Sequence, residues 1–248
     1  MQLDEKWSFV AKKEKHCDWE ADEGDLLKGE QWDFVALDPD SRLVLSACVG
    51  KRLTDNAVTL LDDVKRRLGG RVPELITSDE WAGYPEAIAQ VFGQEVTPER
   101  TGKPGRPPGP RLVVPEELNY ATVHKARAKG RVVSVVTRVV LGALAVVSAL
   151  LGGKKVSTSY VERHNGTDRH RNARKGRKTY RFSKDYEAHE ALTFFTLYSY
   201  NFCWPVRTLR QKIAPTKYRR RTPAMAAGLT DHVWKVSEWL AFPVCQQS

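Results

Sequence analysis

The chain of 248 residues is long enough for one large domain with small attachments, and its 41% hydrophobic content with seven Trp excludes a disordered protein. A formal net charge of +10 indicates a polyanionic partner, either nucleic acid or an anionic membrane surface. The four cysteines are scattered and contain no C-x-x-C pair. They therefore give neither a zinc-knuckle spacing nor a clear disulfide framework, which suits a reducing cytoplasm.

The N-terminal segment predicts three successive strands. Their composition is apolar and β-branched or aromatic, and they occupy residues 2–10, 32–38 and 42–49. The turn residues that follow Asp38 separate the second strand from the third, and a polar hairpin connection separates the first from the second. Short connections of this kind predict an antiparallel meander. Acids at positions 4 and 5, with no apolar run after them, predict that no signal peptide opens the chain.

The next segment predicts a helix, a strand and a second helix. Thr54 is placed to cap a helix that reaches about Leu68, with apolar residues at helical spacing on one side. Residues 74–78 have the composition of a short strand that leads directly into Asp79. The second helix is expected over residues 85–92, where proline stands in the first turn. The predicted order is strand, strand, strand, helix, strand, helix.

The middle of the chain combines a linker with a hairpin. Residues 100–115 are rich in Pro and Gly, which predicts an extended or mobile linker. Residues 119–125 and 131–140 are expected to pair as a hairpin. The apolar stretch 132–151 is long enough to cross a membrane, but Arg138 inside it would be costly in lipid. We therefore expect a buried strand followed by a buried helix that begins after Gly142, and no membrane partner.

A basic segment spans residues 160–184. Glu162 lies near its start, and Lys and Arg dominate the residues after this glutamate. In a helix, Glu162, Asn165 and Arg169 would share one face, which places a carboxylate at the edge of a phosphate-binding surface. A solvated basic helix with an incidental glutamate is the alternative. An apolar, aromatic helix is expected over residues 185–202, and short helices are expected after Thr222 and after Thr230, the latter carrying Trp234 and Trp239.

Three acids on separate elements can converge in such a fold. Asp4 lies on the first strand, Asp79 ends the fourth, and Glu162 lies on the basic helix. Clustered carboxylates repel one another, so their convergence would imply a cation, and hard oxygen ligands favour Mg²⁺ or Mn²⁺. A pair of such ions can activate a water or a 3′-hydroxyl and stabilise the leaving oxygen in phosphodiester transfer.

Several sequence blocks carry a resemblance to a known family. They are LDEKWSFV at 3–10, ITSDEWAGY at 76–84, YVERHNGTDRHRNARKGRKTYRFSKD at 160–185, SYNFCWPVRTL at 199–209 and TPAMAAGLTDHVW at 222–234. With them the chain resembles the catalytic part of a bacterial insertion-sequence transposase, most of all the insertion sequence one family of DDE transposases. Asp4, Asp79 and Glu162 match that family's DDE triad, which implies two Mg²⁺ or Mn²⁺ ions.

The resemblance also implies the fold. It is an α/β, ribonuclease-H-like mixed sheet, with three antiparallel strands and then parallel strands, flanked by helices and with an insertion before the helix that carries the catalytic Glu. The corresponding divisions are 1–99, the first part of the catalytic domain; 100–154, a linker with an inserted hairpin and helix; 155–210, the Glu helix and a C-terminal helix; and 211–248, a basic tail with short helices.

The same resemblance implies DNA contacts along the basic segment. The residues expected to bind DNA, mostly through phosphates, are Arg163, Asn165, Arg169, Arg171, Arg174, Lys175, Arg177 and Lys178. His164 and His170 are expected to contact phosphate or water rather than metal. Of the other acids, Asp33 and Asp38 are expected to cap turns, and Asp168 to neutralise neighbouring arginines.

The expected activity is metal-dependent cleavage and strand transfer of an insertion sequence, in the bacterial cytoplasm at the nucleoid. Its partners would be double-stranded DNA at transposon ends and target, and further copies of the chain in a synaptic complex. Family members usually carry an upstream zinc-binding and helix-turn-helix region, so a separate recognition protein or domain would be a further partner. Two alternatives stay open: a truncated remnant that binds DNA without catalysis, and a nuclease that acts on RNA–DNA hybrids or junctions. The spacing of Asp79 and Glu162 far exceeds that of retroviral integrases.

Overall fold

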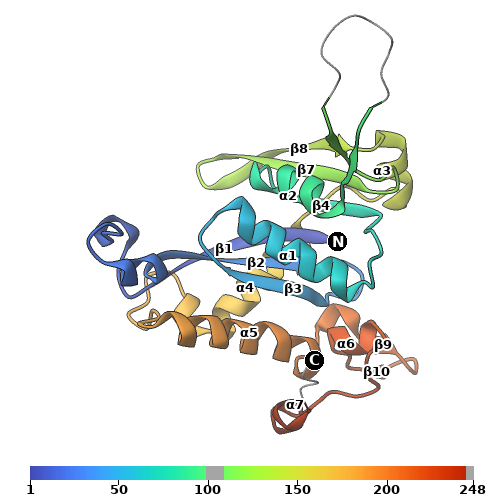
Figure 1. The fold of residues 1–248 in the computed structure, drawn as a ribbon. Coiled ribbons are helices and arrows are strands. Elements are labelled where there is room, and N and C mark those ends of the chain that lie inside the picture. Colours follow the sequence, from blue (N-terminus) through green and yellow to red (C-terminus); the bar gives the residue numbers. More distant parts are fainter. Residues whose placement is uncertain (99–108, 244–248) are drawn as a thin grey trace, which may run out of the picture.

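In the computed structural model, which describes residues 1–98 and 109–243, a mixed six-stranded sheet has helices on both faces (Figure 1). The order of its strands is β3-β2-β1-β4-β7-β8. These strands are β1 (Gln2–Val10), β2 (Gly29–Leu37), β3 (Val44–Gly50), β4 (Leu75–Ser78), β7 (Asn119–Ala128) and β8 (Arg131–Leu141). The helices are α1 (Thr54–Arg67), α2 (Gly83–Phe92), α3 (Leu144–Leu150), α4 (Ser159–Arg171), α5 (Tyr186–Cys203), α6 (Pro223–Ala226) and α7 (Val236–Ala241).

The strand directions confirm the expected mixed sheet. β1, β2 and β3 pair antiparallel as a meander, β4 pairs parallel with β1, and β7 pairs parallel with β4. β8 returns antiparallel to β7 and forms the outer edge of the sheet. The chain is thus an α/β protein in which three antiparallel strands are followed by parallel ones.

Alternating side chains on β2 divide the core between the two faces. Phe34 and Ala36 face the cluster formed with α1 and α2, whereas Val35 and Leu37 face the cluster formed with α4 and α5. All four side chains are fully buried, as expected for a central strand covered on both sides. On the second face, Val161 of α4 packs with Leu197 and Tyr200 of α5, and this packing seats α4 against the sheet.

Several expected boundaries need correction. β2 begins at Gly29 rather than at residue 32, and β3 begins at Val44 rather than at residue 42. Within the expected linker, β6 (Arg111–Val113) pairs with β5 (Gln94–Val96), while residues 99–108 lie outside the described part. In the tail, α6 follows Thr222 as expected, but Trp234 precedes α7 and only Trp239 lies in it. Short strands β9 (Gln211–Lys212) and β10 (Tyr218–Arg219) also pair there.

The hairpin expected inside an insertion supplies two strands of the main sheet. β7 pairs with β4 from Asn119 to Thr122 and then continues without it. The apolar stretch 132–151 is divided between β8 and α3, as the sequence predicts, but most of its side chains are exposed rather than buried. Within the described residues, none of the helices is long and apolar enough to cross a membrane.

A buried ionic network joins four elements on the α4 face of the sheet. Lys6 of β1 contacts Asp168 of α4 and lies 3.2 Å from a carboxylate oxygen of Asp33 on β2. Lys175, in the turn after α4, donates to the other oxygen of Asp33 at 2.5 Å. The side chains of these four residues are almost completely buried.

These contacts correct two expectations about the acids. Asp33 does not cap a turn, and Asp168 pairs with a lysine rather than with arginines. Asp38 does cap its turn, because its carboxylate accepts from the Ser41 amide.

The charges in this network balance. Burial would raise the pKa of Asp33, but Lys175 and Lys6 hold it at about 2, so Asp33 is ionised. His189 of α5 bonds to Ser183 and contacts Lys175, and burial together with Lys175 lowers its pKa to about 4, so it is neutral near pH 7. Two lysines thus face two aspartates. Removing one member would leave an uncompensated buried charge, which is far more costly than losing a surface pair.

We therefore expect Asp33→Asn to lower the free energy of unfolding by about 3–5 kcal/mol, because Lys6 and Lys175 would then share one carboxylate fewer. Urea unfolding at pH 7 measures the change. The control is Arg67→Gln, which breaks an exposed pair with Asp63 and should change stability by at most about 0.5 kcal/mol. A loss of less than about 1 kcal/mol for Asp33→Asn would contradict a charge-balancing role.

Candidate functional site

The candidate site is a cleft that opens where β4 ends between its two neighbours. β1 pairs with β4 at Gln2 and Thr77, β4 stops at Ser78, and β1 and β7 both continue beyond that point. The resulting gap holds a cleft of about 560 Å³. Its lining residues come from β1, the turn after β4, β7, α4 and the start of the loop before α1: Asp4, Arg52, Asp79, Glu80, Trp81, Ala82, Val123, His124, Lys125, Arg127 and Glu162. All three acids expected to act together thus line one cleft.

Asp4, Glu5 and Asp79 form a group of neighbouring carboxylates beside the cleft. One oxygen from each lies within 4.8 Å of the others. Adjacent residues of a strand point to opposite faces, so Asp4 and Glu5 would ordinarily be kept apart by the sheet. Here both approach Asp79, because Asp79 follows the last residue of β4 and no strand fills the gap beside β1 at that level. Alternation along the strand therefore offered no reason to expect Glu5 in the group.

The neighbouring acids strongly perturb Asp4. Burial is the main cause, and the carboxylates of Glu5, Asp79 and Glu162 add to it, raising the pKa of Asp4 to about 7. The side-chain amide of Asn165 on α4 donates to Asp4 at 2.8 Å, which opposes that rise and orients the carboxylate. A cation among these acids would relieve their repulsion, and their all-oxygen donor set fits Mg²⁺ or Mn²⁺.

The carboxylate of Glu5 already has partners within the protein. Arg52 donates to it from Nε at 3.0 Å and pairs with it through Nη2, and the hydroxyl of Tyr84 donates to it at 2.8 Å. Glu5 also does not line the cleft, whereas Glu162 does and is 40% exposed. Glu162 lines the cleft with Asp4 and Asp79 but lies outside the group of carboxylates whose oxygens are within 4.8 Å of one another.

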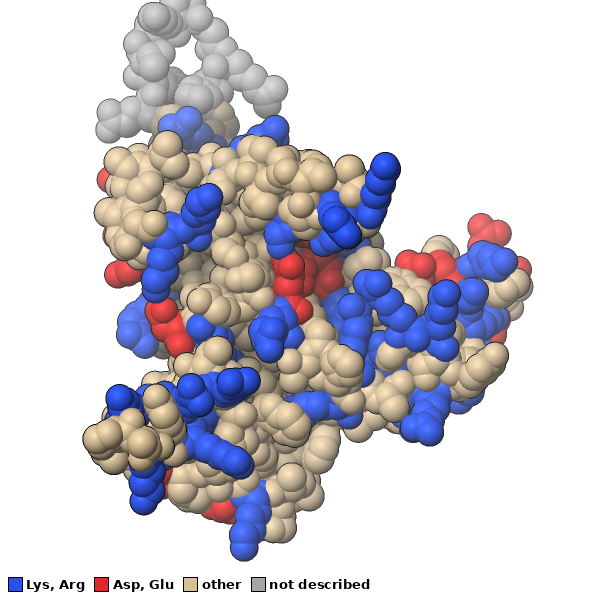
Figure 2. Space-filling model, turned by 180° about the vertical axis from the view of Figure 1, so that it is seen from behind, with Lys and Arg blue, Asp and Glu red and all other residues tan. Residues whose placement is uncertain are grey.

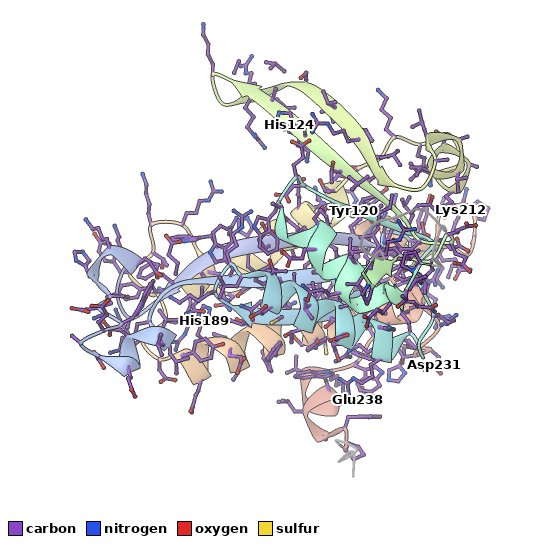
Figure 3. The ribbon with its side chains drawn as sticks, turned by 45° about the horizontal axis from the view of Figure 1, so that its top comes forward. Tyr120, His124, His189, Lys212, Asp231 and Glu238 are labelled. Carbon is purple, nitrogen blue, oxygen red and sulfur yellow. The ribbon has the colours of Figure 1, made fainter. Side chains whose placement is uncertain are left out.

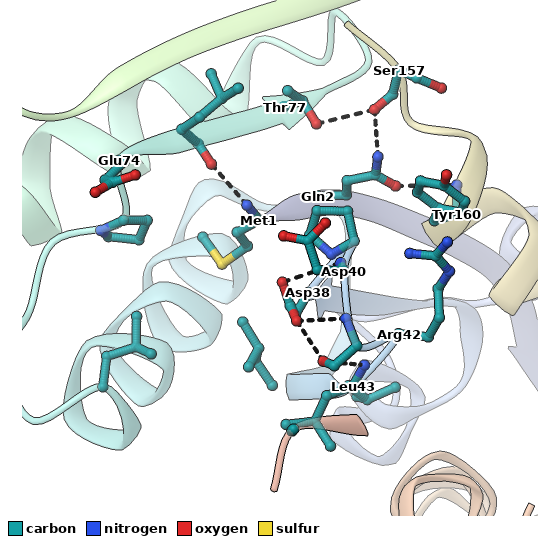
Figure 4. Close-up of a pocket in the computed structure, with 18 of the residues that line it drawn as sticks. Met1, Gln2, Asp38, Asp40, Arg42, Leu43, Glu74, Thr77, Ser157 and Tyr160 are labelled. Atoms are coloured by element: carbon teal, nitrogen blue, oxygen red, sulfur yellow. Dashed lines mark hydrogen bonds between the residues drawn. The ribbon is translucent and has the colours of Figure 1, made fainter. Parts of the chain in front are cut away.

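The start of α4, which positions Glu162, is tied to the middle of the sheet (Figure 4). The side-chain oxygen of Gln2 on β1 accepts from the backbone amides of Tyr160 and Val161 at 3.1 and 3.0 Å. The Gln2 amide and the Thr77 hydroxyl both donate to the carbonyl of Ser157, at 2.6 and 3.2 Å. The two bonds accepted by the Gln2 oxygen satisfy free amides in the first turn of the helix, and the other two satisfy the Ser157 carbonyl just before it. They fix the position of the first turn of α4, and with it Glu162, relative to β1 and β4.

Lys125 of β7 is the counter-ion of Glu162. Its ammonium contacts Glu162 and lies 3.3 Å from the hydroxyl of Thr158, which also donates to Glu162. Lys125 reaches Glu162 across the cleft from the opposite wall. The sequence analysis did not identify this lysine as a site residue. Its position at the end of an expected strand was the only sequence feature that could have indicated it.

The structure separates the residues expected to bind DNA into two groups. Arg163, Arg174, Arg177 and Lys178 are exposed, as is His170. Asn165 is buried and bonds to Asp4, and Lys175 is buried in the ionic network, so neither offers its side chain to a surface ligand. Arg169 is partly buried.

Arg171 and His164 also have structural contacts. Arg171 donates to the carbonyl of Thr196 at 2.8 Å and to the Ser199 hydroxyl at 3.1 Å, so it fastens α4 to α5. His164 is buried against the ring of Tyr200, and this burial lowers its pKa to about 4. The expectation that His164 contacts phosphate is therefore wrong. The sequence of a polar helix does not show which of its charged or imidazole side chains are buried and which are exposed.

Figure 2, drawn from the face that carries α4, shows acidic side chains gathered in a hollow with Lys and Arg around them. The carboxylates of the cleft are thus recessed between cations on this face of the molecule.

No protein-family model and no curated protein matches this chain.

The raised pKa of Asp4 predicts a pH-dependent stability in the absence of metal. The folded protein holds a proton on Asp4 up to about pH 7, whereas an unfolded chain releases it near pH 4. The contribution of Asp4 to the free energy of unfolding therefore falls as the pH rises from about 4 to about 7, and it is lowest above pH 7. Asp4→Asn should remove this loss, so the variant gains up to about 4 kcal/mol over wild type at pH 8 and much less at pH 4.

Urea unfolding in EDTA at pH 4, 6 and 8 measures the difference. Asp62→Asn, on the exposed side of α1, is the control and should follow wild type at all three values. Curves for Asp4→Asn and wild type that stay parallel over this range would contradict the prediction.

Proposed function

We propose that this chain is the catalytic part of a DDE-type DNA transposase, which cleaves DNA and joins the resulting 3′-hydroxyl to a target in a reaction that depends on Mg²⁺ or Mn²⁺. The observation that carries the proposal is that Asp4, Asp79 and Glu162, from three elements far apart in sequence, line a single cleft. The strand order β3-β2-β1-β4-β7, with the first acid on β1 and the second directly after β4, supports the ribonuclease-H-like fold that such enzymes use.

Asp4, Asp79 and Glu162 would hold the metal in this proposal. When bound, two ions would activate the attacking oxygen and stabilise the leaving one. Asn165 orients the Asp4 carboxylate through its hydrogen bond, and Gln2 fixes the start of the helix that carries Glu162. Arg52 and Tyr84 donate to Glu5, so its carboxylate already has partners within the protein.

Exposed cations around the cleft would hold the DNA backbone. Arg163, Arg174, Arg177 and Lys178 offer charge on the α4 side, and Arg127 offers it on the β7 side. Their contacts would be to phosphates, so they would position the scissile bond without reading its sequence. Holding a reacting phosphodiester in line with its attacking group accounts for a large part of catalysis in such reactions.

The activity test is cleavage and joining of a labelled DNA end with Mg²⁺ or Mn²⁺. We expect product with wild type, none with EDTA, and a loss of at least about 100-fold with Asp79→Asn or Glu162→Gln, because each removes a charged ligand. Asp62→Asn is the control and should retain full activity. Intact DNA binding without cleavage in wild type would instead favour the non-catalytic remnant, and cleavage of RNA–DNA hybrids alone would favour a nuclease.

Metal binding gives a second, independent readout. Mg²⁺ at about 100 times its Kd should stabilise wild type by about 2.7 kcal/mol, because only the folded chain brings the acids together. Thermal unfolding with and without Mg²⁺ at pH 8 measures this gain. The gain should be absent in Asp79→Asn and unchanged in Asp62→Asn. Equal stabilisation of wild type and Asp79→Asn would place the metal elsewhere and contradict the site.

A further inference from the structure

The β7–β8 hairpin extends beyond the rest of the sheet at the position of the candidate site. β4 ends at Ser78, which pairs with Thr122, but β7 continues for six residues to Ala128. At about 3.3 Å per residue this overhang is roughly 20 Å long. We call residues 123–137, which pair as Val123–Thr137 to Ala128–Arg131, the ribbon. Figures 1 and 3 show it standing away from the body, with Tyr120 within the body and His124 further out on the ribbon.

The ribbon starts at the carboxylates. Asp79 directly follows β4, so the level at which β7 loses its neighbour is also the level of the acid cluster. Val123, His124, Lys125 and Arg127 line the cleft, and Glu80 beside Asp79 holds His124 at 2.6 Å. The ribbon is thus a wall of the cleft that continues outward from it.

The charge of the ribbon has a single sign. No Asp or Glu occurs in the sequence between Glu117 and Glu162. The ribbon itself carries Lys125, Arg127, Lys129 and Arg131, and Arg127, Lys129 and Arg131 are exposed at or near its tip. Lys129 and Gly130 both have positive φ, as a tight two-residue turn requires, so the tip presents its cations on a defined scaffold. A surface of this kind fits a polyanion.

The ribbon also exposes valines on both faces. Val132, Val133, Val135 and Val136 are between 44% and 62% exposed, although valine is among the residues most often buried. A two-stranded ribbon is narrow enough to enter the major groove of DNA, where thymine methyl groups offer apolar contacts and phosphates line both rims. The composition of the ribbon suits such a groove, because its valines could contact the bases while its cations contact the phosphates at the rims.

A second copy of the chain fits this surface less well. Two β8 edges could pair antiparallel, since an exposed edge strand is a template for another strand. That pairing would bring two ribbons of equal positive charge together without an acid on either to offset the repulsion. Duplex DNA satisfies both the charge and the apolar surface.

We propose that the ribbon is a DNA-binding element, which enters a groove of the duplex next to the scissile bond and guides one strand into the cleft. This inference rests on the proposed function for the identity of the DNA, and it adds a contact surface outside the basic segment of α4. Its cations act as duplex contacts, and its valines contact base edges in the groove.

The experiment measures the affinity of the full chain for a fluorescein-labelled duplex of about 30 base pairs by anisotropy, at a series of salt concentrations. The ribbon variant combines Arg127→Gln, Lys129→Asn and Arg131→Gln, in which Asn tolerates the positive φ of the turn. The matched control combines Arg66→Gln, Arg67→Gln and Arg71→Gln, which removes the same formal charge from the end of α1 and the loop after it, at residues that do not line the cleft. A third variant, Val133→Thr with Val135→Thr, keeps the charge and the strand propensity.

We expect the ribbon variant to bind at least about tenfold more weakly at 0.1 M salt and to lose up to about 3 units of the log–log salt slope, because each lost phosphate contact removes about 0.9. The control should change less than about threefold. Val133→Thr with Val135→Thr should weaken binding while leaving the slope unchanged.

Other results would overturn the inference in distinguishable ways. Wild type that binds DNA and cleaves it, with the ribbon variant and the control equally affected, would leave the proposed function standing and remove the ribbon from it. Wild type that binds no DNA would remove both. A change from dimer to monomer in sedimentation of the ribbon variant, with DNA affinity intact, would assign the ribbon to contacts between copies of the chain.

Discussion

Lys6 is the residue on which the geometry of the α4 face depends. It lies on β1 two residues after Asp4, and its buried ammonium pairs with Asp33 of β2 and Asp168 of α4. A charge in a buried position requires partners at fixed places, since an unpaired one would cost several kcal/mol. The network therefore permits little sliding of α4 across the sheet. Glu162 and Asn165 lie on that same helix, so the constraint on Asp168 also determines where they stand relative to Asp4.

The second constraint is the shortness of β4. Parallel sheets place functional groups at the carboxyl ends of their strands, and a cleft forms where neighbouring strands are not joined by a third. Here β4 ends at Ser78 while β1 and β7 continue, so the gap has a strand on each side and Asp79 at its base. That gap lets Asp79 approach Asp4 and Glu5 together. It also leaves β7 and β8 without support beyond the cleft, so the same strand end that forms the cleft produces the ribbon.

Burial sorts the cations of the chain into structural and accessible ones. Lys6 and Lys175 balance buried aspartates, Arg171 fastens two helices, and Arg52 neutralises Glu5. Exposed cations lie on both sides of the cleft, along α4 and its following turn and along the ribbon. The excess positive charge of the sequence is therefore partly internal, and the part available to a polyanion is distributed over two walls rather than one helix.

Local patterns determined much of this protein. Hydrophobic periodicity and turn residues specified the three strands of the meander, α1, β4, α2, the hairpin and α5, because each pattern reflects a side-chain repeat within one element. They also identified Asp4, Asp79 and Glu162 as acids on elements that could converge. The tertiary structure alone decided that Glu5 joins Asp79, that Lys125 faces Glu162, and that Lys175, Arg171 and His164 point inward. These outcomes depend on which elements are neighbours and where a strand stops, and such long-range facts leave no periodic trace in the sequence. A lysine that pairs with a buried aspartate and an exposed lysine are identical in the sequence, and only the tertiary structure shows which of them is buried.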